Sequence, residues 1–187
     1  DSESKYSKYF PKAIEFKTSN PSSILPYLYN REAKHALRKF LDENIQPDLA
    51  HLQIYYGHLT SSILTELQTR GIPIIQTLHE YKFSCPVYTH ISGDTICEKC
   101  LDGSSLNVIL NKCKNNSYAQ SSIRYLESRI SRLLGDISKI DMFLCVSKFQ
   151  KSLMQRVGIP EHKLKVLYNF VDLPENNNTT PHKNYFL

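Results

Sequence analysis

A short, largely apolar segment, Ile74–Leu78, ends at the ionisable residues His79 and Glu80 and is followed by a stretch rich in cysteine. This arrangement constrains the fold more than any other feature of the chain, because a short apolar run of this kind is typical of a buried strand. In open α/β proteins the loops after the carboxyl ends of such strands carry the ligand-binding groups. The segment therefore predicts an α/β fold whose reactive edge begins at His79.

The rest of the chain alternates between helix-like and strand-like segments. Apolar residues at helical spacing predict helices at 31–44, between caps at 60–62 and Gly71, at 118–138 and at 148–156. Short apolar runs predict strands at 13–17, 49–53, 74–78, 141–146 and 165–167. Because the connections are long enough for helices, we expect a Rossmann-like parallel sheet with helices on both faces and an inserted cysteine-rich loop.

Length and composition indicate one soluble domain. The chain has 187 residues, which is enough for one core but too few for two full α/β domains. Its net charge of +5 fits an anionic ligand or a membrane surface but is too diffuse to indicate nucleic-acid binding. No apolar run approaches the roughly 18–20 residues of a membrane span, and no signal peptide opens the chain. We therefore expect a cytoplasmic protein without a disulfide framework.

Two common phosphate-binding loops are missing from the sequence. It contains neither G-x-x-x-x-G-K-[ST] nor G-x-G-x-x-G, and it has only six glycines. The chain therefore has no recognisable nucleotide site of its own.

His79 and Glu80 stand where the central strand meets its loop. An imidazole there can hydrogen-bond to, or exchange protons with, a hydroxylated or phosphorylated ligand, and the adjacent carboxylate can orient a sugar hydroxyl. The alternative is a structural histidine that satisfies backbone carbonyl groups. Position alone leaves both interpretations open.

Four cysteines, Cys85, Cys97, Cys100 and Cys113, form the pattern C-x11-C-x2-C-x12-C. The central C-x2-C can hold a tetrahedral ion from two sides of a tight turn, and the outer pair can complete four thiolate ligands. Four thiolates leave no open position for water, so we predict a structural zinc and no catalytic metal. The alternative is a mobile loop with four reduced thiols. The fifth cysteine, Cys145, lies in an apolar run and is predicted to belong to the core.

The helix predicted at 118–138 has an apolar stripe and a basic side. Arg124, Arg129 and Arg132 lie toward the basic side and could contact anionic lipid head groups. The alternative is a solvated face over a stripe that covers the sheet, which is the more common use of this pattern.

Several short motifs resemble, in the same order, the amino-terminal domain of glycosyltransferase family 4. They are Pro47–Leu52, Gly71–Ile75, Thr77–Lys82, Cys85–Pro86, Cys97–Cys100, Val146–Phe149 and Asn169–Asp172. The resemblance covers about residues 30–172, and its most specific part is the Thr-Leu-His-Glu stretch with the C-x2-C that follows.

This resemblance implies one half of a two-domain GT-B enzyme, with the active cleft between two Rossmann-like domains. Such enzymes are retaining transferases that move a sugar from a nucleotide-sugar donor, here to a glycan or lipid-linked acceptor. Residues 1–172 would form the acceptor-side domain, and 173–187 the linker and the start of an absent nucleotide-sugar-binding domain.

The resemblance also implies roles for individual residues. His79 would be catalytic and would face the donor sugar and its phosphate, whereas Glu80, Tyr81 and Ser147 would bind substrate. The enzyme would make a surface polysaccharide or glycolipid in the cytoplasm, with peripheral membrane contact and without nucleic acid.

The chain departs from the family pattern in three places. The first strand with its glycine-rich loop is absent, and so is the second domain, so we expect an excerpt of a larger enzyme that does not turn over substrate alone. His51-Leu52-Gln53 stands where the family often has His-x-His, which leaves the role of a second histidine open.

Two other functions are consistent with parts of the sequence, namely a zinc-stabilised module that binds nucleic acid or protein, and a non-catalytic homologue. A nucleic-acid module should interleave cations with aromatic residues around the cysteines. The only lysines and arginines within 85–113 are Lys99 and Lys112, which favours the transferase.

Overall fold

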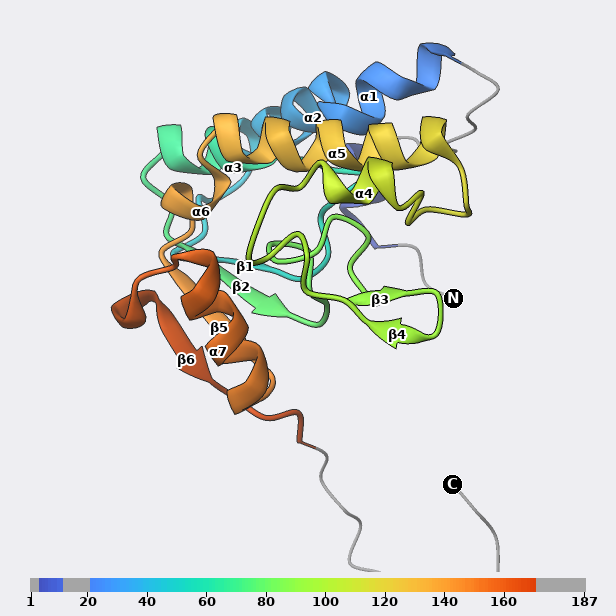
Figure 1. Ribbon diagram of the computed structural model, residues 1–187. Helices are drawn as coiled ribbons and strands as arrows, with labels where there is room; N and C mark the ends of the chain where they lie inside the picture. The colour runs from blue at the N-terminus through green and yellow to red at the C-terminus, as the bar shows by residue number, and fades with distance from the viewer. Residues whose placement is uncertain (1–3, 12–20, 171–187) are drawn as a thin grey trace, which may run out of the picture.

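The structure is a computed structural model that describes residues 4–11 and 21–170. Four parallel strands form its central sheet in the order β1–β2–β5–β6 (Figure 1). The strands are β1 (Ala50–Leu52), β2 (Ile74–Leu78), β5 (Met142–Cys145) and β6 (Leu164–Val166). The predicted α/β fold with a Rossmann-like parallel sheet is confirmed. The strand predicted at 13–17 and the linker predicted at 173–187 lie outside the described residues.

Helices flank the sheet. The α-helices are α1 (Ile24–Leu28), α2 (Arg31–Glu43), α3 (Ser62–Thr69), α4 (Asn107–Leu110), α5 (Tyr118–Leu133), α6 (Asp136–Lys139) and α7 (Lys148–Val157). Short 3-10 turns are η1 (Ser7–Tyr9), η2 (Pro21–Ser23) and η3 (Glu161–Lys163). In Figure 1, α1, α2, α3 and α5 form a layer above the sheet, and α7 packs against β5 and β6.

Local sequence determines where the main helices begin and end. Asn30 caps α2 by accepting a hydrogen bond from the Ala33 N–H (3.0 Å). Ser147 caps α7 by accepting from the Gln150 N–H (3.0 Å). Gly158 ends α7 with a φ of 95°, in the left-handed region that glycine adopts without strain.

The helix predicted at 118–138 is two helices. α5 and α6 are separated by Gly135, which adopts a left-handed conformation with a φ of 70°. The break lets the side chain of Asp136, which is buried, accept hydrogen bonds from Ser61 (2.5 Å) and Ser131 (2.6 Å). The apolar spacing continues across the glycine, so periodicity alone does not reveal the break.

One core lies between the sheet and the helices. Its centre consists of side chains with no exposed surface, namely Leu64, Ile74, Ile140, Phe143, Cys145 and Met154. Cys145 therefore belongs to the core, as predicted. In β5 the side chains of Met142 and Leu144, on the opposite face from Phe143, are half-buried. The described residues thus cover one face of the sheet more completely than the other.

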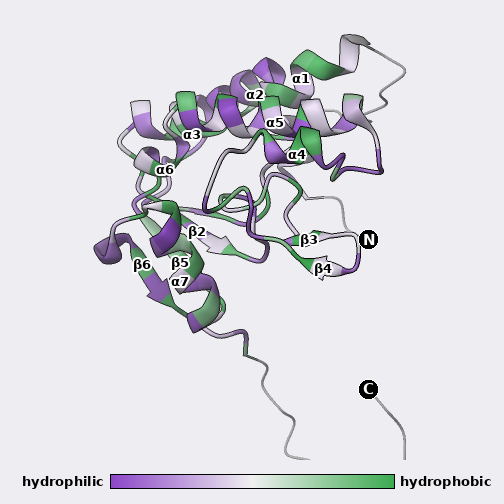
Figure 2. Ribbon diagram, viewed as in Figure 1, coloured by the Kyte–Doolittle hydropathy of each residue, from purple (hydrophilic) through white to green (hydrophobic). Residues whose placement is uncertain are grey.

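α5 is amphipathic, with hydrophobic and hydrophilic residues alternating around it (Figure 2). Glu127 is buried, whereas Leu126, Arg129 and Leu133 are exposed. Arg124 turns inward and pairs with Glu127 (3.3 Å), so it does not belong to the basic outer face suggested by the sequence. Within the described residues, no helix is long and apolar enough to cross a membrane.

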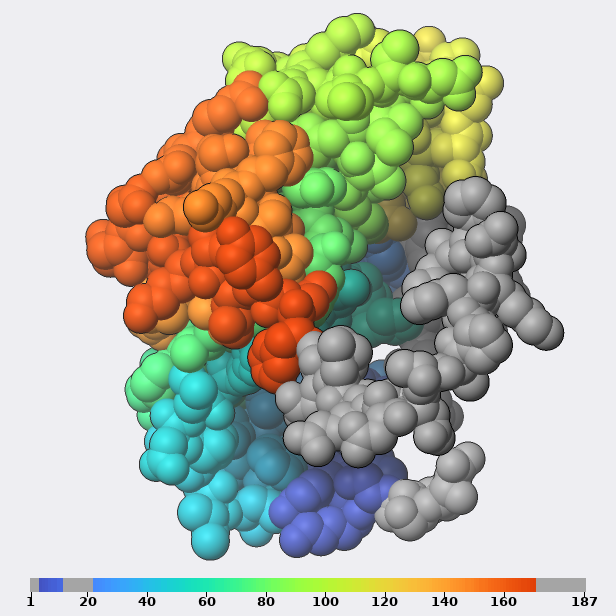
Figure 3. All heavy atoms as spheres, turned by 90° about the horizontal axis from the view of Figure 1, so that it is seen from below, coloured from blue at the N-terminus to red at the C-terminus, as the bar shows by residue number. Residues whose placement is uncertain are grey.

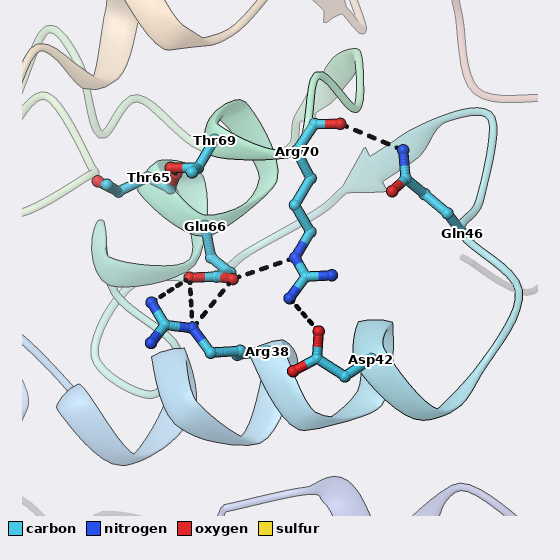
Figure 4. Close-up of polar contacts among 7 residues, drawn as sticks. All are labelled: Arg38, Asp42, Gln46, Thr65, Glu66, Thr69 and Arg70. Atoms are coloured by element: carbon cyan, nitrogen blue, oxygen red, sulfur yellow. Dashed lines mark hydrogen bonds and ion pairs between the residues drawn. The ribbon is translucent and has the colours of Figure 1, made fainter.

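An ion-pair network joins α2 to α3 (Figure 4). Glu66 is only 3% exposed and accepts hydrogen bonds from Arg38 (2.9 and 3.2 Å) and from Arg70 (3.2 Å). Arg70 also pairs with Asp42 (2.5 Å), and Gln46 donates to the Arg70 carbonyl oxygen (3.2 Å). The hydrogen bonds from Arg38 hold the pKa of Glu66 below its usual value. The buried carboxylate is tolerated because two guanidinium groups pair with it.

Candidate functional site

The predicted substrate-binding residues gather at the carboxyl edge of the sheet. β2 and β5 are paired so that their last residues lie opposite each other. His79, Glu80 and Tyr81 follow β2, and Ser147 lies just past the end of β5. Because parallel strands present their carboxyl ends at one edge, all four residues share that edge, where ligands bind in open α/β sheets.

His79 is exposed and is linked by side-chain hydrogen bonds to the end of β1. Its Nε2 lies 2.6 Å from Oε1 of Gln53, and Nε2 of Gln53 lies 3.3 Å from Nε2 of His51. The same His51 nitrogen lies 2.7 Å from the Thr77 hydroxyl. Among the described residues, the partner of the His79 ring is therefore a side chain.

Sequence reasoning missed Gln53 as a site residue. The sequence did contain a signal for it, because Gln53 directly follows β1. The end of β1 lies beside the end of β2 in the sheet. Two strand ends that are adjacent in a parallel sheet bring their following side chains together, although many residues separate them in the chain.

Glu80 is half-buried, and its Oε1 is buried without a hydrogen-bond partner among the described residues. Burial raises the pKa of this carboxyl group. The backbone oxygen of Glu80 accepts a hydrogen bond from the side chain of Gln150 in α7 (3.3 Å). This bond ties the backbone that follows His79 to α7. A buried acceptor without a partner is rare in folded proteins, and the contact of Glu80 with substrate stays a prediction.

Tyr81 and Ser147 have structural roles in the fold. The Tyr81 ring packs edge-to-face against His90 and Phe149, with ring centroids 5.3 and 6.3 Å apart. The Ser147 hydroxyl is engaged as the cap of α7. Local packing and capping thus account for both residues, and their contacts with substrate stay predictions.

Beneath this edge, the ammonium group of Lys82 is buried in a cluster that sequence reasoning also missed. Its Nζ forms an ion pair with Glu127 of α5 (2.8 Å), and the two side chains are only 3% and 8% exposed. The rings of Tyr56 and Tyr88 lie 5.2 and 4.6 Å from the ammonium, within the range of cation–π attraction. Burial lowers the pKa of Lys82, and the charge of Glu127 opposes that shift.

Glu127 connects the loop after β2 to α5 and α1. Besides Lys82, it accepts hydrogen bonds from the hydroxyl groups of Tyr27 (3.1 Å) and Tyr88 (3.3 Å). The sequence signal for this cluster was a glutamate inside the apolar stripe that also contains Ile123 and Ile130. The cluster therefore anchors the loop that begins at the candidate site.

The Cys85–Cys113 segment has secondary structure of its own. It contains an antiparallel pair, β3 (Ile91–Ser92) and β4 (Thr95–Ile96), followed by α4. The buried His90 ring bridges its parts, with Nδ1 3.0 Å from the Cys97 carbonyl oxygen and Nε2 2.7 Å from the Ser84 hydroxyl. These bonds hold the C-x2-C turn near the start of the segment.

The thiols of this segment gather in one region. All five cysteines of the chain have free thiols. Burial and the neighbouring thiols of Cys85, Cys113 and Cys97 raise the pKa of Cys100 to about 11. Within residues 4–11 and 21–170, however, no group of three or more His, Cys, Asp or Glu side chains is arranged as a metal site. The neighbouring thiols thus affect the pKa of Cys100, but the four sulfurs are not arranged as a metal site.

The cysteine-bearing segment adjoins α7 at the surface. Figure 3 shows this segment (lime) next to the segment from β5 to β6 (orange to red). Arg156 of α7 pairs with Glu98 (2.7 Å), which lies within the C-x2-C turn, and with Asp102 (2.6 Å), which follows it. Exposed pairs of this kind contribute little to stability, but they locate the turn relative to the sheet.

A cavity of about 360 Å³ lies between η1, α2, β1 and α3. It is lined mainly by apolar side chains, which include Phe10, Leu37, Phe40, Leu59 and Ile63. This lining suits packing or an apolar ligand.

Comparison with known proteins agrees with the resemblance seen in the motifs. Residues 2–175 match the family model described as Glycosyltransferase Family 4. No curated protein and no solved structure has significant similarity to the chain.

Proposed function

Since this chain belongs to glycosyltransferase family 4, we propose that it is the acceptor-side domain of a retaining glycosyltransferase. The enzyme transfers a sugar from a nucleotide-sugar donor to a glycan or lipid-linked acceptor, in the cytoplasm, during the synthesis of a surface polysaccharide. The observation that carries this proposal is the exposed His79 at the carboxyl end of the central strand, held by Gln53 from the neighbouring strand end.

In this proposal His79 faces the donor sugar and its diphosphate across the cleft. When the sugar–phosphate bond breaks, positive charge develops at the anomeric carbon and the leaving diphosphate gains negative charge. A polar group that is already in place interacts most strongly at that point of the reaction. Glu80 contributes to acceptor binding, because its half-buried carboxyl group follows His79 at the same edge of the sheet and a carboxylate can orient a sugar hydroxyl.

The proposal predicts different behaviour for the chain and for the complete enzyme. The 187-residue chain lacks a phosphate-loop pattern, so we expect it to bind nucleotide sugars poorly and to transfer no sugar. The complete enzyme that contains it should bind one of them and release nucleotide when acceptor is added. Calorimetry of both proteins with uridine and guanosine diphosphate sugars, followed by a nucleotide-release assay, measures this.

Two results would contradict the proposal. Tight binding by the 187-residue chain alone would place the nucleotide site in this half of the enzyme. A complete enzyme that binds no nucleotide sugar and releases no nucleotide would favour the non-catalytic homologue.

We also propose peripheral contact between α5 and an anionic membrane surface. Leu126 and Leu133 of this helix are 44% and 78% exposed, and the exposed Arg129 and Arg132 lie beside them. An exposed helix face that combines apolar and basic side chains is suited to the boundary between head groups and acyl chains. Such contact would bring a lipid-linked acceptor close to the transferase.

We further propose that Cys85, Cys97, Cys100 and Cys113 hold one structural zinc. The donor set fits this ion, because zinc prefers thiolates and four of them complete a tetrahedral site. The thiols of Cys85, Cys97 and Cys113 contribute to the raised pKa of Cys100, which is consistent with four thiols in one region of the segment. Such a zinc would tie the C-x2-C turn to the start of the segment and to the end of α4.

Metal analysis of the purified chain is expected to give about one zinc per molecule. Cys100→Ser should lower the zinc content and the melting temperature. Cys145→Ala provides the matched control for zinc content, because Cys145 lies in the core of β5 and outside the cluster. A fully folded, metal-free protein whose four thiols react with an alkylating reagent would disprove the zinc site.

A further inference from the structure

The side chain of Gln53 lies between two histidines at the open edge of the sheet. Its Oε1 is 2.6 Å from Nε2 of His79, and its Nε2 is 3.3 Å from Nε2 of His51. The Thr77 hydroxyl is 2.7 Å from the same His51 nitrogen. Gln53 is therefore placed to transmit the position and protonation of one histidine to the other.

The chemistry of the amide determines the direction of each hydrogen bond in this arrangement. An amide nitrogen can only donate and an amide oxygen can only accept. Nε2 of Gln53 then donates to Nε2 of His51, which places a His51 proton on Nδ1, and the Thr77 hydroxyl shares the single lone pair of the same nitrogen. Nε2 of His79 must donate to Gln53, which leaves Nδ1 of His79 available to a ligand.

We propose that Gln53 is a positioning residue that holds His79 as the Nε2–H tautomer and presents its Nδ1 to the substrate. His51 supports this role because its contact orients the amide of Gln53, and Thr77 in turn holds the ring of His51. The role in catalysis rests on the proposed transferase function, whereas the tautomer of His79 does not. The family often has His-x-His at the place of residues 51–53. This chain has His51-Leu52-Gln53 there, so the amide of Gln53 stands in place of the second histidine.

The contribution of Gln53 to stability should be small. His51, Gln53 and His79 are all exposed, so water can replace each of their hydrogen bonds when one is lost. Loss of the Gln53–His79 hydrogen bond is therefore expected to change the orientation of the His79 ring and the nitrogen that carries its proton. Misplacement of a reacting group by about 1 Å can cost on the order of 10²-fold in rate.

Nitrogen-15 NMR of the histidine side chains tests the inference without any assay of activity. The unsubstituted chain should show His79, assigned by comparison with His79→Ala, mainly as the Nε2–H tautomer. Gln53→Met, which has similar length but no hydrogen-bonding amide, should give a mixture of tautomers with an unchanged melting temperature. Gln53→Glu retains an acceptor for His79, so it should keep the Nε2–H tautomer and raise the pKa of His79 through its negative charge.

The kinetic part uses the complete enzyme. Gln53→Met should lower kcat by roughly 10- to 100-fold with little change in KM for the donor. Gln53→Glu should restore part of kcat and shift the pH profile upward. Gln46→Met is the matched control, because among the described residues the Gln46 side chain bonds only the Arg70 carbonyl. The kcat of this variant should be unchanged.

The inference is overturned if His79 shows the same tautomer with and without Gln53, or if Nδ1 carries the proton in the unsubstituted chain. Normal kcat in Gln53→Met would remove the catalytic role. A complete enzyme without transferase activity would instead remove the proposed function, and the NMR measurement would still decide the role of Gln53.

Discussion

Replacing Glu127 with alanine is expected to lower the free energy of unfolding by about 3–5 kcal/mol, because it leaves a buried ammonium without its partner. Lys82 and Glu127 are 3% and 8% exposed and lie 2.8 Å apart. Removal of the carboxylate also leaves the hydroxyl groups of Tyr27 and Tyr88 without this acceptor. Urea denaturation of the 187-residue chain measures the effect.

The pH dependence of this variant has a definite sign. Burial already lowers the pKa of Lys82 below the ordinary value of 10.5, and loss of Glu127 should lower it further. The unfolded chain then binds more protons than the folded chain between the two pKa values, so stability rises with pH in that window. The loss in free energy of unfolding caused by Glu127→Ala should therefore become smaller as the solution becomes alkaline and the amine of Lys82 becomes neutral.

Two comparison variants separate this effect from a general loss of charge. Glu43→Ala removes an exposed carboxylate that pairs with Lys39 (3.9 Å), so it should cost less than about 1 kcal/mol. The double variant Lys82→Met, Glu127→Leu removes both buried charges and should recover part of the lost stability. If Glu127→Ala is as stable as Glu43→Ala, the buried pair does not anchor the loop.

Replacing His79 with alanine is expected to lower kcat of the complete enzyme by roughly 10²-fold or more, the scale seen when one preorganised polar group is lost. The side chain is exposed and bonds only Gln53 among the described contacts, so the melting temperature should change little. Steady-state kinetics and thermal melts of the same preparations provide both numbers. A His79→Ala enzyme with normal kcat and a large drop in melting temperature would make His79 a structural residue.

His35→Ala is a suitable control for that experiment. His35 lies on the helix α2 and not at the end of a strand, and it belongs to the same residue type. Its substitution should leave kcat unchanged. A similar loss of kcat in both variants would point to a general defect of the preparation and not to the site.

Much of the fold could be predicted because its signals are local. The bounds of β2 agree with the predicted strand at 74–78, since its apolar residues and the proline before it are contiguous in sequence. α2 and α7 follow helical spacing and begin at the capping side chains Asn30 and Ser147. The position of His79 at the strand end follows from the same local pattern.

The contacts that define the site could not be predicted in the same way. Gln53 reaches His79 only because β1 and β2 are neighbours in the sheet. Lys82 meets Glu127 only because α5 packs over the loop after β2. Each pair is far apart in the chain, and many partners of suitable charge or polarity were available to each residue.

The sequence by itself determined the alternation of strands and helices, the parallel sheet and the edge at which His79 stands. The reason is that periodicity, capping and strand ends depend on residues within a few positions of one another. The tertiary structure alone decided that Gln53 holds His79, that Glu127 neutralises Lys82 and that Asp136 turns inward after Gly135. These are choices among distant partners, and they depend on which surfaces the folded chain brings into contact.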